Sequence, residues 1–152
     1  MTTMAGQTTA NAIATRQWFT EGWRGNIALA DTLFAECFAT NGAEVGPVGP
    51  KRNIVARLDG FPDLTTEVED IVATGDMVVI RVLWRGTHTG FYAGVPATGR
   101  PVQVRVISMW RFEQGRVVEN WTLQDQFSLL QQIGFLAPEL TAAQVRDISH
   151  AP

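Results

Sequence analysis

The segment from residue 75 to residue 135 decides the fold that this sequence predicts. It contains GDMVVIRVLWRG over residues 75–86, VQVRVISMWRF over 102–112 and VVENWTLQDQFSLLQQIGF over 117–135. The first two runs are long and apolar, as central strands are, and the four residues before the third run are typical of a tight hairpin. The third run predicts a strand that ends at Asp125 and is followed by a short helix.

The sequence before this segment predicts helices first and one more strand after them. Apolar residues at helical spacing indicate a helix from Asn11 to about Gly22, a second helix over residues 27–39 and a short third helix over residues 53–58. The apolar period then changes to two over residues 64–72, which predicts a half-exposed strand. Because helices and strands do not alternate, we expect an α+β fold, with an antiparallel sheet and helices packed on one side of it.

The length of 152 residues suits a single domain. We expect a flexible N-terminal tail over residues 1–10, the domain over residues 11–137 and a peripheral C-terminal tail over residues 138–152. The net charge is −3 and no run of Lys or Arg occurs, so nucleic acid is not an expected partner. Without a signal peptide or a long apolar run, and with one cysteine, the chain is expected to be cytoplasmic and to have no membrane partner.

Asp125 is the first candidate for a catalytic residue. Read at period two, Trp121, Leu123 and Asp125 point to the same side of the third strand, so we expect the acid to lie among apolar side chains. A carboxylate in such surroundings loses hydration, its pKa rises from about 3.9, and it can act as a general acid and base near neutral pH. The alternative is structural, because Asp125 precedes a predicted helix and its carboxylate could cap the first turn.

Five short motifs stand out along the predicted domain. They are Phe61-Pro62-Asp63-Leu64, Gly75-Asp76, Gly86-Thr87-His88-Thr89-Gly90, Pro96-Ala97-Thr98-Gly99-Arg100 and Trp121-Thr122-Leu123-Gln124-Asp125. Together with the order of the predicted elements, they resemble the SnoaL-like polyketide cyclases, which belong to the nuclear transport factor 2-like superfamily. The resemblance covers residues 11–136 and is fairly specific as a combination, although each motif alone is weak.

This resemblance implies a cone-shaped curved antiparallel sheet with three to four helices packed on its concave side, a deep pocket, homodimers, and no metal or organic cofactor. In the best-known members, an aspartate on the last strand removes and returns a proton during an intramolecular aldol closure, and the matching residue here is Asp125. Those cyclases also carry a histidine on the strand before the last hairpin, where this chain has ISMWR over residues 107–111. The same fold hosts other chemistries, so the fold alone does not determine the reaction.

Several other side chains are candidates for the site. His88, in a Gly-flanked connection, is a second catalytic candidate as a hydrogen-bond donor to a substrate carbonyl or a partner of Asp125; the alternative is a rim histidine that bonds its own loop. Aromatic residues are candidates for substrate binding, with core packing as the alternative for each. They are Trp18, Trp110 and Trp121 as walls, and Phe91 and Tyr92 as a lid.

Four arginines share one parity on the central strands: Arg81, Arg85, Arg105 and Arg111. The simplest interpretation is an outer sheet face, solvated or within a dimer interface, with acidic partners such as Glu67 and Glu69. The alternative is that Arg105 or Arg81 turns inward and binds substrate, where it stabilises an enolate or orients Asp125.

We therefore expect a cofactor-independent enzyme that uses an aspartate as general acid and base on a hydrophobic carbonyl substrate, in the manner of a polyketide cyclase. A flat polycyclic molecule is one candidate substrate. The two histidines and one cysteine do not provide a zinc site, and no metal is expected. Two alternatives stay open: a protein that holds a small molecule without turnover, and a hydratase, epoxide hydrolase or hydroxylase-like relative.

Overall fold

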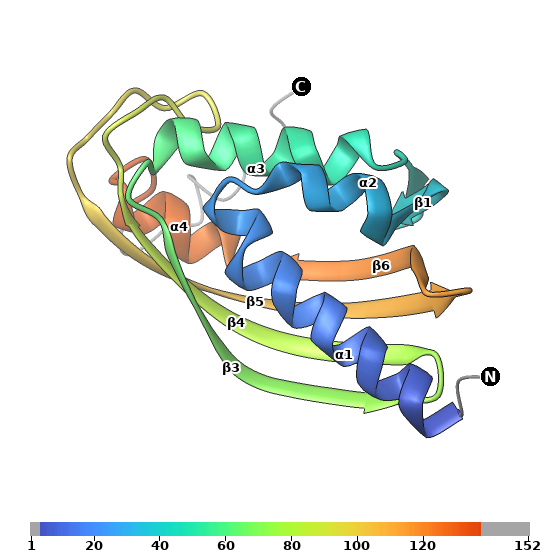
Figure 1. Cartoon of the computed structure of the whole chain (residues 1–152). Coiled ribbons are helices and arrows are strands. Elements are labelled where there is room, and N and C mark those ends of the chain that lie inside the picture. The colour runs from blue at the N-terminus through green and yellow to red at the C-terminus, as the bar shows by residue number, and fades with distance from the viewer. Residues whose placement is uncertain (1–3, 138–152) are drawn as a thin grey trace.

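The computed structural model describes residues 4–137 as a curved sheet with helices across one of its faces (Figure 1). The long helix α1 (Met4–Thr20) leads through the 3-10 turns η1 (Gly22–Arg24) and η2 (Ile27–Leu29) to the short helix α2 (Ala30–Leu33). Strands β1 (Phe34–Thr40) and β2 (Ala43–Glu44) precede helix α3 (Val48–Gly60). Four longer strands follow, and helix α4 (Gln126–Gln132) comes last. These strands are β3 (Thr65–Thr74), β4 (Met77–Thr87), β5 (Pro101–Glu113) and β6 (Arg116–Gln124).

The sheet has the strand order β2-β1-β6-β5-β4-β3. Strands β3 to β6 form the predicted antiparallel meander, and the β5–β6 hairpin turns through Gln114 and Gly115, which both have positive φ, as the tightest hairpin turns require. The α+β class is therefore confirmed. The expectation of a purely antiparallel sheet is wrong for one pair, because β1 lies parallel to β6 and extends the sheet at that edge.

Residues 27–39 do not form the single helix that their apolar spacing predicts. Helix α2 ends at Leu33, and β1 starts at Phe34. Residues four apart, such as Phe34 and Phe38, share one side of a strand as well as one side of a helix, so the spacing alone does not distinguish the two. Both side chains are buried in the core, and Phe34 contacts Trp110 with the ring centroids 5.3 Å apart. These tertiary contacts and the pairing with β6 favour the strand.

Two other helices are longer than predicted. Helix α1 begins at Met4, so residues 4–10, expected to be a frayed tail, are helical, and α3 extends beyond residues 53–58 at both ends. The predicted C-terminal tail over residues 138–152 lies outside the described residues, as do residues 1–3. Within the part of the chain that is described, none of the helices combines the length and the apolar character that a membrane-spanning segment requires.

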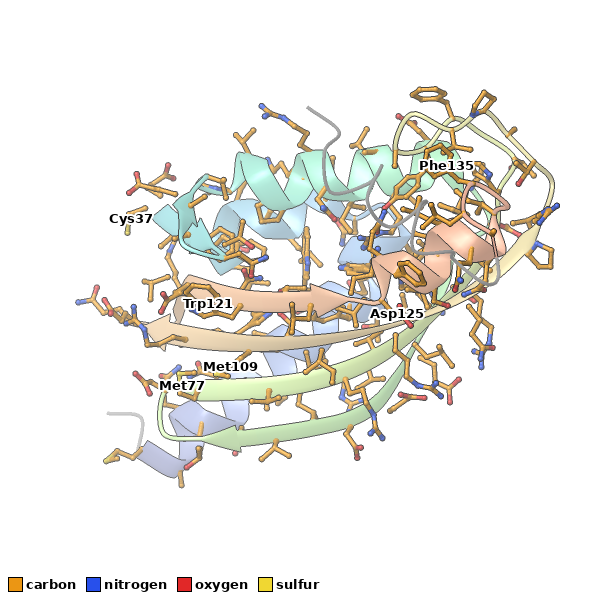
Figure 2. The ribbon with its side chains drawn as sticks, turned by 180° about the vertical axis from the view of Figure 1, so that it is seen from behind. Cys37, Met77, Met109, Trp121, Asp125 and Phe135 are labelled. Atoms are coloured by element: carbon orange, nitrogen blue, oxygen red, sulfur yellow. The ribbon has the colours of Figure 1, made fainter. Side chains whose placement is uncertain are left out.

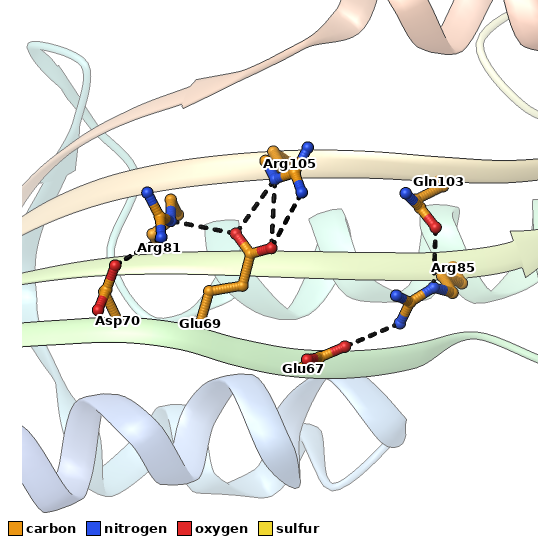
Figure 3. Close-up of polar contacts among 7 residues, drawn as sticks. All are labelled: Glu67, Glu69, Asp70, Arg81, Arg85, Gln103 and Arg105. Atoms are coloured by element: carbon orange, nitrogen blue, oxygen red, sulfur yellow. Dashed lines mark hydrogen bonds and ion pairs between the residues drawn. The ribbon is translucent and has the colours of Figure 1, made fainter.

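The outer face of the sheet, away from α1, carries the arginines as the simplest interpretation predicted. Arg105 and Arg81 both pair with Glu69, at 3.1 Å, and Arg85 pairs with Glu67 at 3.0 Å (Figure 3). The guanidinium of Arg105 beside Glu69 holds the pKa of that carboxyl below its usual range. Because these charges satisfy each other outside the sheet, the alternative of an inward Arg105 or Arg81 is wrong.

An apolar band runs across the same outer face. Val72, Val79, Met109 and Trp121 are direct neighbours on β3, β4, β5 and β6, and all four are between 37% and 65% exposed. The next row brings Ile107 beside Leu123, at 53% and 81% exposure. Figure 2, which views the molecule from behind, shows Met109 and Trp121 on adjacent strands. We refer to these six residues as the outer apolar band.

The long connection between β4 and β5 is held against the end of α3. The amides of Thr89 and Gly90 both donate to the carbonyl of Gly60, at 3.1 Å. His88 is fully buried there: its backbone pairs with Arg100 and Thr98, and its Nδ1 lies 2.9 Å from the Thr98 hydroxyl. The connection is therefore anchored at the point where it brings Tyr92 over the end of α3.

Asp63 supplies an acid-sensitive contact near this anchor. Its two carboxylate oxygens accept hydrogen bonds of 2.7 Å from the backbone amide and the hydroxyl of Thr87, and these bonds hold the pKa of Asp63 below its ordinary value. A depressed folded-state pKa means that the stabilisation is complete above the unfolded-state pKa, about 3.9, and is lost as the pH falls through the folded-state pKa.

We therefore expect the stability difference between wild type and Asp63→Asn to be about 0.5 kcal/mol at pH 7, since the site is exposed. The difference should shrink as the pH falls from 5 towards 2. Urea unfolding midpoints of the two proteins across this pH range provide the measurement. An unchanged difference over the whole range would contradict the assignment.

Candidate functional site

A cavity of about 610 Å³ lies between the sheet and the helices that cover it. Its sides come from the C-terminal end of α1, from η1 and from one side of α3, and its floor comes from β1, β5 and β6. Bulky aromatic side chains supply much of the wall: Trp18, Phe19, Trp23, Phe34, Phe38 and Trp110. Such rigid apolar walls suit a bulky organic ligand. Trp18 and Trp110, which were predicted as wall residues, both line the cavity, and their role in substrate binding stays a prediction.

Polar groups enter the cavity from alternate positions of β6. Asn120, Thr122 and Gln124 line it, whereas Trp121 and Leu123 lie on the outer face. A bulge at Val118 sets this parity: Phe112 pairs with Val117 and Arg111 with Glu119, so one residue of β6 is left over. The extra residue shifts the inward positions from the odd numbers to the even ones.

Hydroxyl groups occupy the inward positions where β5 and β6 face each other. Ser108 is fully buried, its hydroxyl oxygen accepts a hydrogen bond of 2.7 Å from the indole N–H of Trp110, and it lies 2.5 Å from the Thr122 hydroxyl. Asn41 completes the group, since its Oδ1 accepts from the Thr122 amide at 2.8 Å. Thr122 and Asn41 line the cavity and can hydrogen-bond to ligand oxygens, whereas Ser108 contacts Thr122 from outside the lining; none of the three is a carboxylate or an imidazole.

Arg57 of α3 is the most buried charged side chain of the lining. It is 6% exposed, its guanidinium carbon lies 4.2 Å from the centroid of the Trp23 ring, and its Nη2 donates to the Gln124 amide oxygen at 3.0 Å. Burial lowers the pKa of Arg57, and Tyr92 opposes this shift. Arg57 is not among the site residues that the sequence predicts.

Gln124 holds the Arg57 guanidinium in one orientation. Its amide oxygen also accepts from the indole N–H of Trp84, at 3.3 Å, and its amide nitrogen donates to Gln126 at 2.8 Å. Because Arg57 and Trp84 can only donate, the amide oxygen must face them.

Asp125 does not occupy the position predicted for a catalytic acid. Strand β6 ends at Gln124, and the Asp125 carboxylate is exposed and accepts a hydrogen bond of 3.0 Å from the Ser128 amide, so it caps α4. Trp121 and Leu123 do lie on one side of β6, as expected, but that side is the outer one. The predicted apolar surroundings of Asp125 and the pocket wall at Trp121 are therefore wrong; Figure 2 shows Asp125 where β6 passes into α4 and Trp121 farther back along β6.

The remaining predicted residues divide between the cavity and other places. Tyr92 lines the cavity, but Phe91 beside it is 65% exposed and is not part of the lining. His88 packs against Phe61, with ring centroids 5.3 Å apart, and bonds its own loop, which matches the structural alternative. Arg105 lies on the outer face. The structure therefore does not bring His88 or Arg105 together with Asp125 in one pocket.

No three side chains of His, Cys, Asp and Glu within residues 4–137 come close enough together to form a metal-binding group. The cavity residues are instead aromatic, amide, hydroxyl and guanidinium groups. Chemically, this set can exclude water from a flat molecule and hydrogen-bond to its oxygens.

Comparisons with known proteins agree with this architecture. A protein from Jannaschia sp. CCS1, proposed to be a SnoaL-like polyketide cyclase, superposes with a TM-score of 0.77 at 25% identity, over 87% of this chain and 95% of that one. IdmH from Streptomyces antibioticus, a proposed polyketide cyclase, superposes with a TM-score of 0.72 at 31% identity, over 82% of this chain and 98% of that one. AclR from Streptomyces galilaeus, a proposed hydroxylase, superposes with a TM-score of 0.72 at 26% identity, over 97% of this chain and 92% of that one. No curated protein sequence matches the chain.

The curved sheet with helices across its concave side defines a nuclear transport factor 2-like protein. The sequence profile of the SnoaL-like polyketide cyclases matches residues 13–133. The chain belongs to the SnoaL-like polyketide cyclase family.

Proposed function

We propose that the protein binds a polyketide-type molecule in the cavity and holds it in a folded conformation against the aromatic walls, as a cyclase does before ring closure. The observation that carries this proposal is the cavity itself, about 610 Å³ in volume, with aromatic walls and hydrogen-bonding groups at its floor. Holding two reacting carbons of one chain in the right geometry is a large part of the catalysis of a ring closure. The family and the related solved structures support the ligand class.

In this proposal the protein contributes shape and hydrogen-bond donors. Hydrogen-bond donors aimed at a carbonyl oxygen of the ligand stabilise negative charge that develops on that oxygen. The described cavity lining contains no carboxylate and no imidazole, which favours this role over proton transfer by Asp125. The same observation favours the second candidate function, a protein that binds the molecule without turnover.

Two neighbouring residues of β6 provide a matched test of the cavity. Thr122→Phe adds a ring inside the cavity, whereas Leu123→Phe adds one on the outer face. Anthraquinone, a neutral flat molecule, should quench the tryptophan fluorescence of the wild type and of Leu123→Phe with similar dissociation constants. Thr122→Phe should weaken binding about 10-fold or more, because the added ring takes the space of the ligand.

Asp125→Asn serves as the second control in this titration. Asparagine is also a good helix cap, so stability and anthraquinone binding should both stay close to the wild-type values. If a substrate is identified, a loss of about 10²- to 10⁴-fold in the turnover of Asp125→Asn would instead support the general-base role expected from the sequence. Equal binding by Thr122→Phe and Leu123→Phe would contradict the cavity as the binding site.

We also propose that two chains pair through the outer apolar band. Four apolar side chains on adjacent strands are exposed to water: Trp121, Met109, Ile107 and Leu123. Covering them with another apolar surface is favourable. The neighbouring charges on the outer face, such as Glu69 and Arg105, already pair within the chain, so covering the band leaves them satisfied. A second copy presents the same band, as a two-fold interface requires.

A further inference from the structure

Arg57 is a buried cation that has no anion to balance it. Within residues 4–137 it forms an ion pair with no carboxylate, and its Nε and Nη1 atoms are buried and donate to no hydrogen-bond acceptor. Its guanidinium donates at 3.0 Å to the neutral amide of Gln124, and Tyr92 beside it opposes the lowering of its pKa by burial without supplying a carboxylate. Burying a charge in this way is costly unless something compensates for it.

The surrounding groups compensate for only part of this cost. The Trp23 and Trp84 rings lie 4.2 Å and 5.4 Å from the guanidinium carbon, and the faces of such rings attract a cation. Contacts of this kind do not replace the hydrogen bonds that the N–H groups of Nε and Nη1 would donate to water. The ligand-free protein therefore maintains a charge that its own fold leaves incompletely neutralised.

The charged side chains of the cavity lining are positive, although the net charge of the chain is negative. The chain carries a net charge of −3, but the lining contains two arginines, Arg52 and Arg57, and no Asp or Glu. Arg52 is exposed, so water screens its charge, whereas Arg57 is buried, so water screens its field less. A negative group in the cavity is consequently attracted mainly by Arg57.

We propose that Arg57 is the counter-ion for a negatively charged oxygen group of the ligand, such as a carboxylate or an ionised enol. This inference rests on the proposed function, since it names the chemical class of the molecule that the cavity holds. Gln124 orients the guanidinium before the ligand arrives, because it is itself held by Trp84 and Gln126. An acidic ligand therefore supplies the charge that the protein lacks, and the corresponding neutral ligand does not.

A pair of probes that differ only in charge tests the inference. Anthraquinone-2-carboxylate and its methyl ester share one ring system, and the quenching of tryptophan fluorescence gives a dissociation constant for each. At neutral pH we expect the wild type to bind the carboxylate about 10- to 100-fold more tightly than the ester, in line with the strength of hydrogen bonds to charged groups. Arg57→Met should abolish this preference and bind both probes with an affinity close to that of the wild type for the ester.

Arg52→Met is the matched control, because it removes the same charge from the exposed part of the lining. It should keep most of the preference, and Arg57→Lys, which retains the buried charge, should keep more of it than Arg57→Met. Thermal unfolding of Arg57→Met checks its fold; replacing an unbalanced buried charge by an apolar group of similar length should leave the melting temperature unchanged or raise it. Arg57→Gln takes its place if the methionine variant does not fold.

Three results would overturn the inference while leaving the cavity as a binding site. They are equal affinities of the wild type for both probes, a carboxylate preference that persists in the neutral Arg57 variants, and an equal loss of preference in Arg52→Met. Failure of the wild type to bind either probe would instead count against the proposed function itself, and this inference would fall with it.

Discussion

Gly90→Ala is expected to lower the free energy of unfolding by about 3 kcal/mol, the upper part of the usual range for overpacking a folded structure. A Cβ atom at Gly90 would lie 1.8 Å from the carbonyl oxygen of Asp59 and 2.9 Å from its carbonyl carbon. Both are backbone atoms at the end of α3, so no side-chain rotation relieves the clash. The loop must move away, and the hydrogen bonds from Thr89 and Gly90 to Gly60 would break.

Urea unfolding provides the measurement, with Gly94→Ala as the matched control in the same loop. A Cβ at Gly94 meets no atom within 4 Å, but its φ of +82° is unfavourable for alanine, so a smaller loss of about 1 kcal/mol is expected. Because Tyr92 lies between these two glycines and lines the cavity, Gly90→Ala should also weaken anthraquinone binding. Equal stability of the two variants would contradict the close packing of Gly90 on α3.

Leu123→Glu is expected to weaken the proposed dimer by about 100-fold or more, because it places a charge in the outer apolar band next to its two-fold equivalent. Leu123 is 81% exposed in the single chain, so the substitution should change the stability of the monomer little. Sedimentation velocity over a range of concentrations should give the mass of two chains for the wild type and of one chain for the variant.

Val55→Glu is the control for added charge. Val55 is also exposed, at 45%, but it lies on α3, on the other side of the molecule from the outer apolar band. This variant should sediment as the wild type does. A monomeric wild type at micromolar concentration, or a Leu123→Glu variant that still sediments as two chains, would contradict pairing through this band.

Much of the fold could be predicted because its central strands have an unambiguous pattern. Strand β5 alternates between buried and exposed residues along nearly its whole length, and the apolar runs of β4 and β5 identify the middle of the sheet. The ion pairs of the outer face follow from the same alternation. The position of β1 could not be predicted, since its parallel partner is about 80 residues away and the spacing of Phe34 and Phe38 also suits a helix.

The candidate site was harder to predict, and the reasons lie in single residues. The period-two pattern correctly grouped Trp121 with Leu123, but it could not determine which side of the sheet that group faces. Two consecutive apolar residues, Val117 and Val118, interrupt the alternation of β6 just after the hairpin turn. This interruption could have indicated the bulge that lies there. Asp125 lies one residue after the end of β6 and caps α4, so the alternation of the strand does not extend to it.

Arg57 could not be found from its local sequence. It stands in RNIVARLDG, over residues 52–60, where an arginine in an amphipathic helix predicts a solvated face. Only the tertiary fold, which brings Trp23, Trp84 and Gln124 around it, makes this side chain a buried one. The wall residues Trp18 and Trp110 were easier to predict, because large aromatic side chains are inside a domain whether they line a cavity or fill a core.

The bulge at Val118 has a consequence for how this protein can change over evolution. On β6 the ligand-facing and solvent-facing side chains alternate, so a deletion or insertion of one codon there would exchange the two sets. Trp121 and Leu123 would turn inward, and Asn120 and Thr122 would turn outward. A single indel could thus alter chemical selectivity and self-association in one step, and the length of this hairpin should vary less among functional descendants than the loops elsewhere.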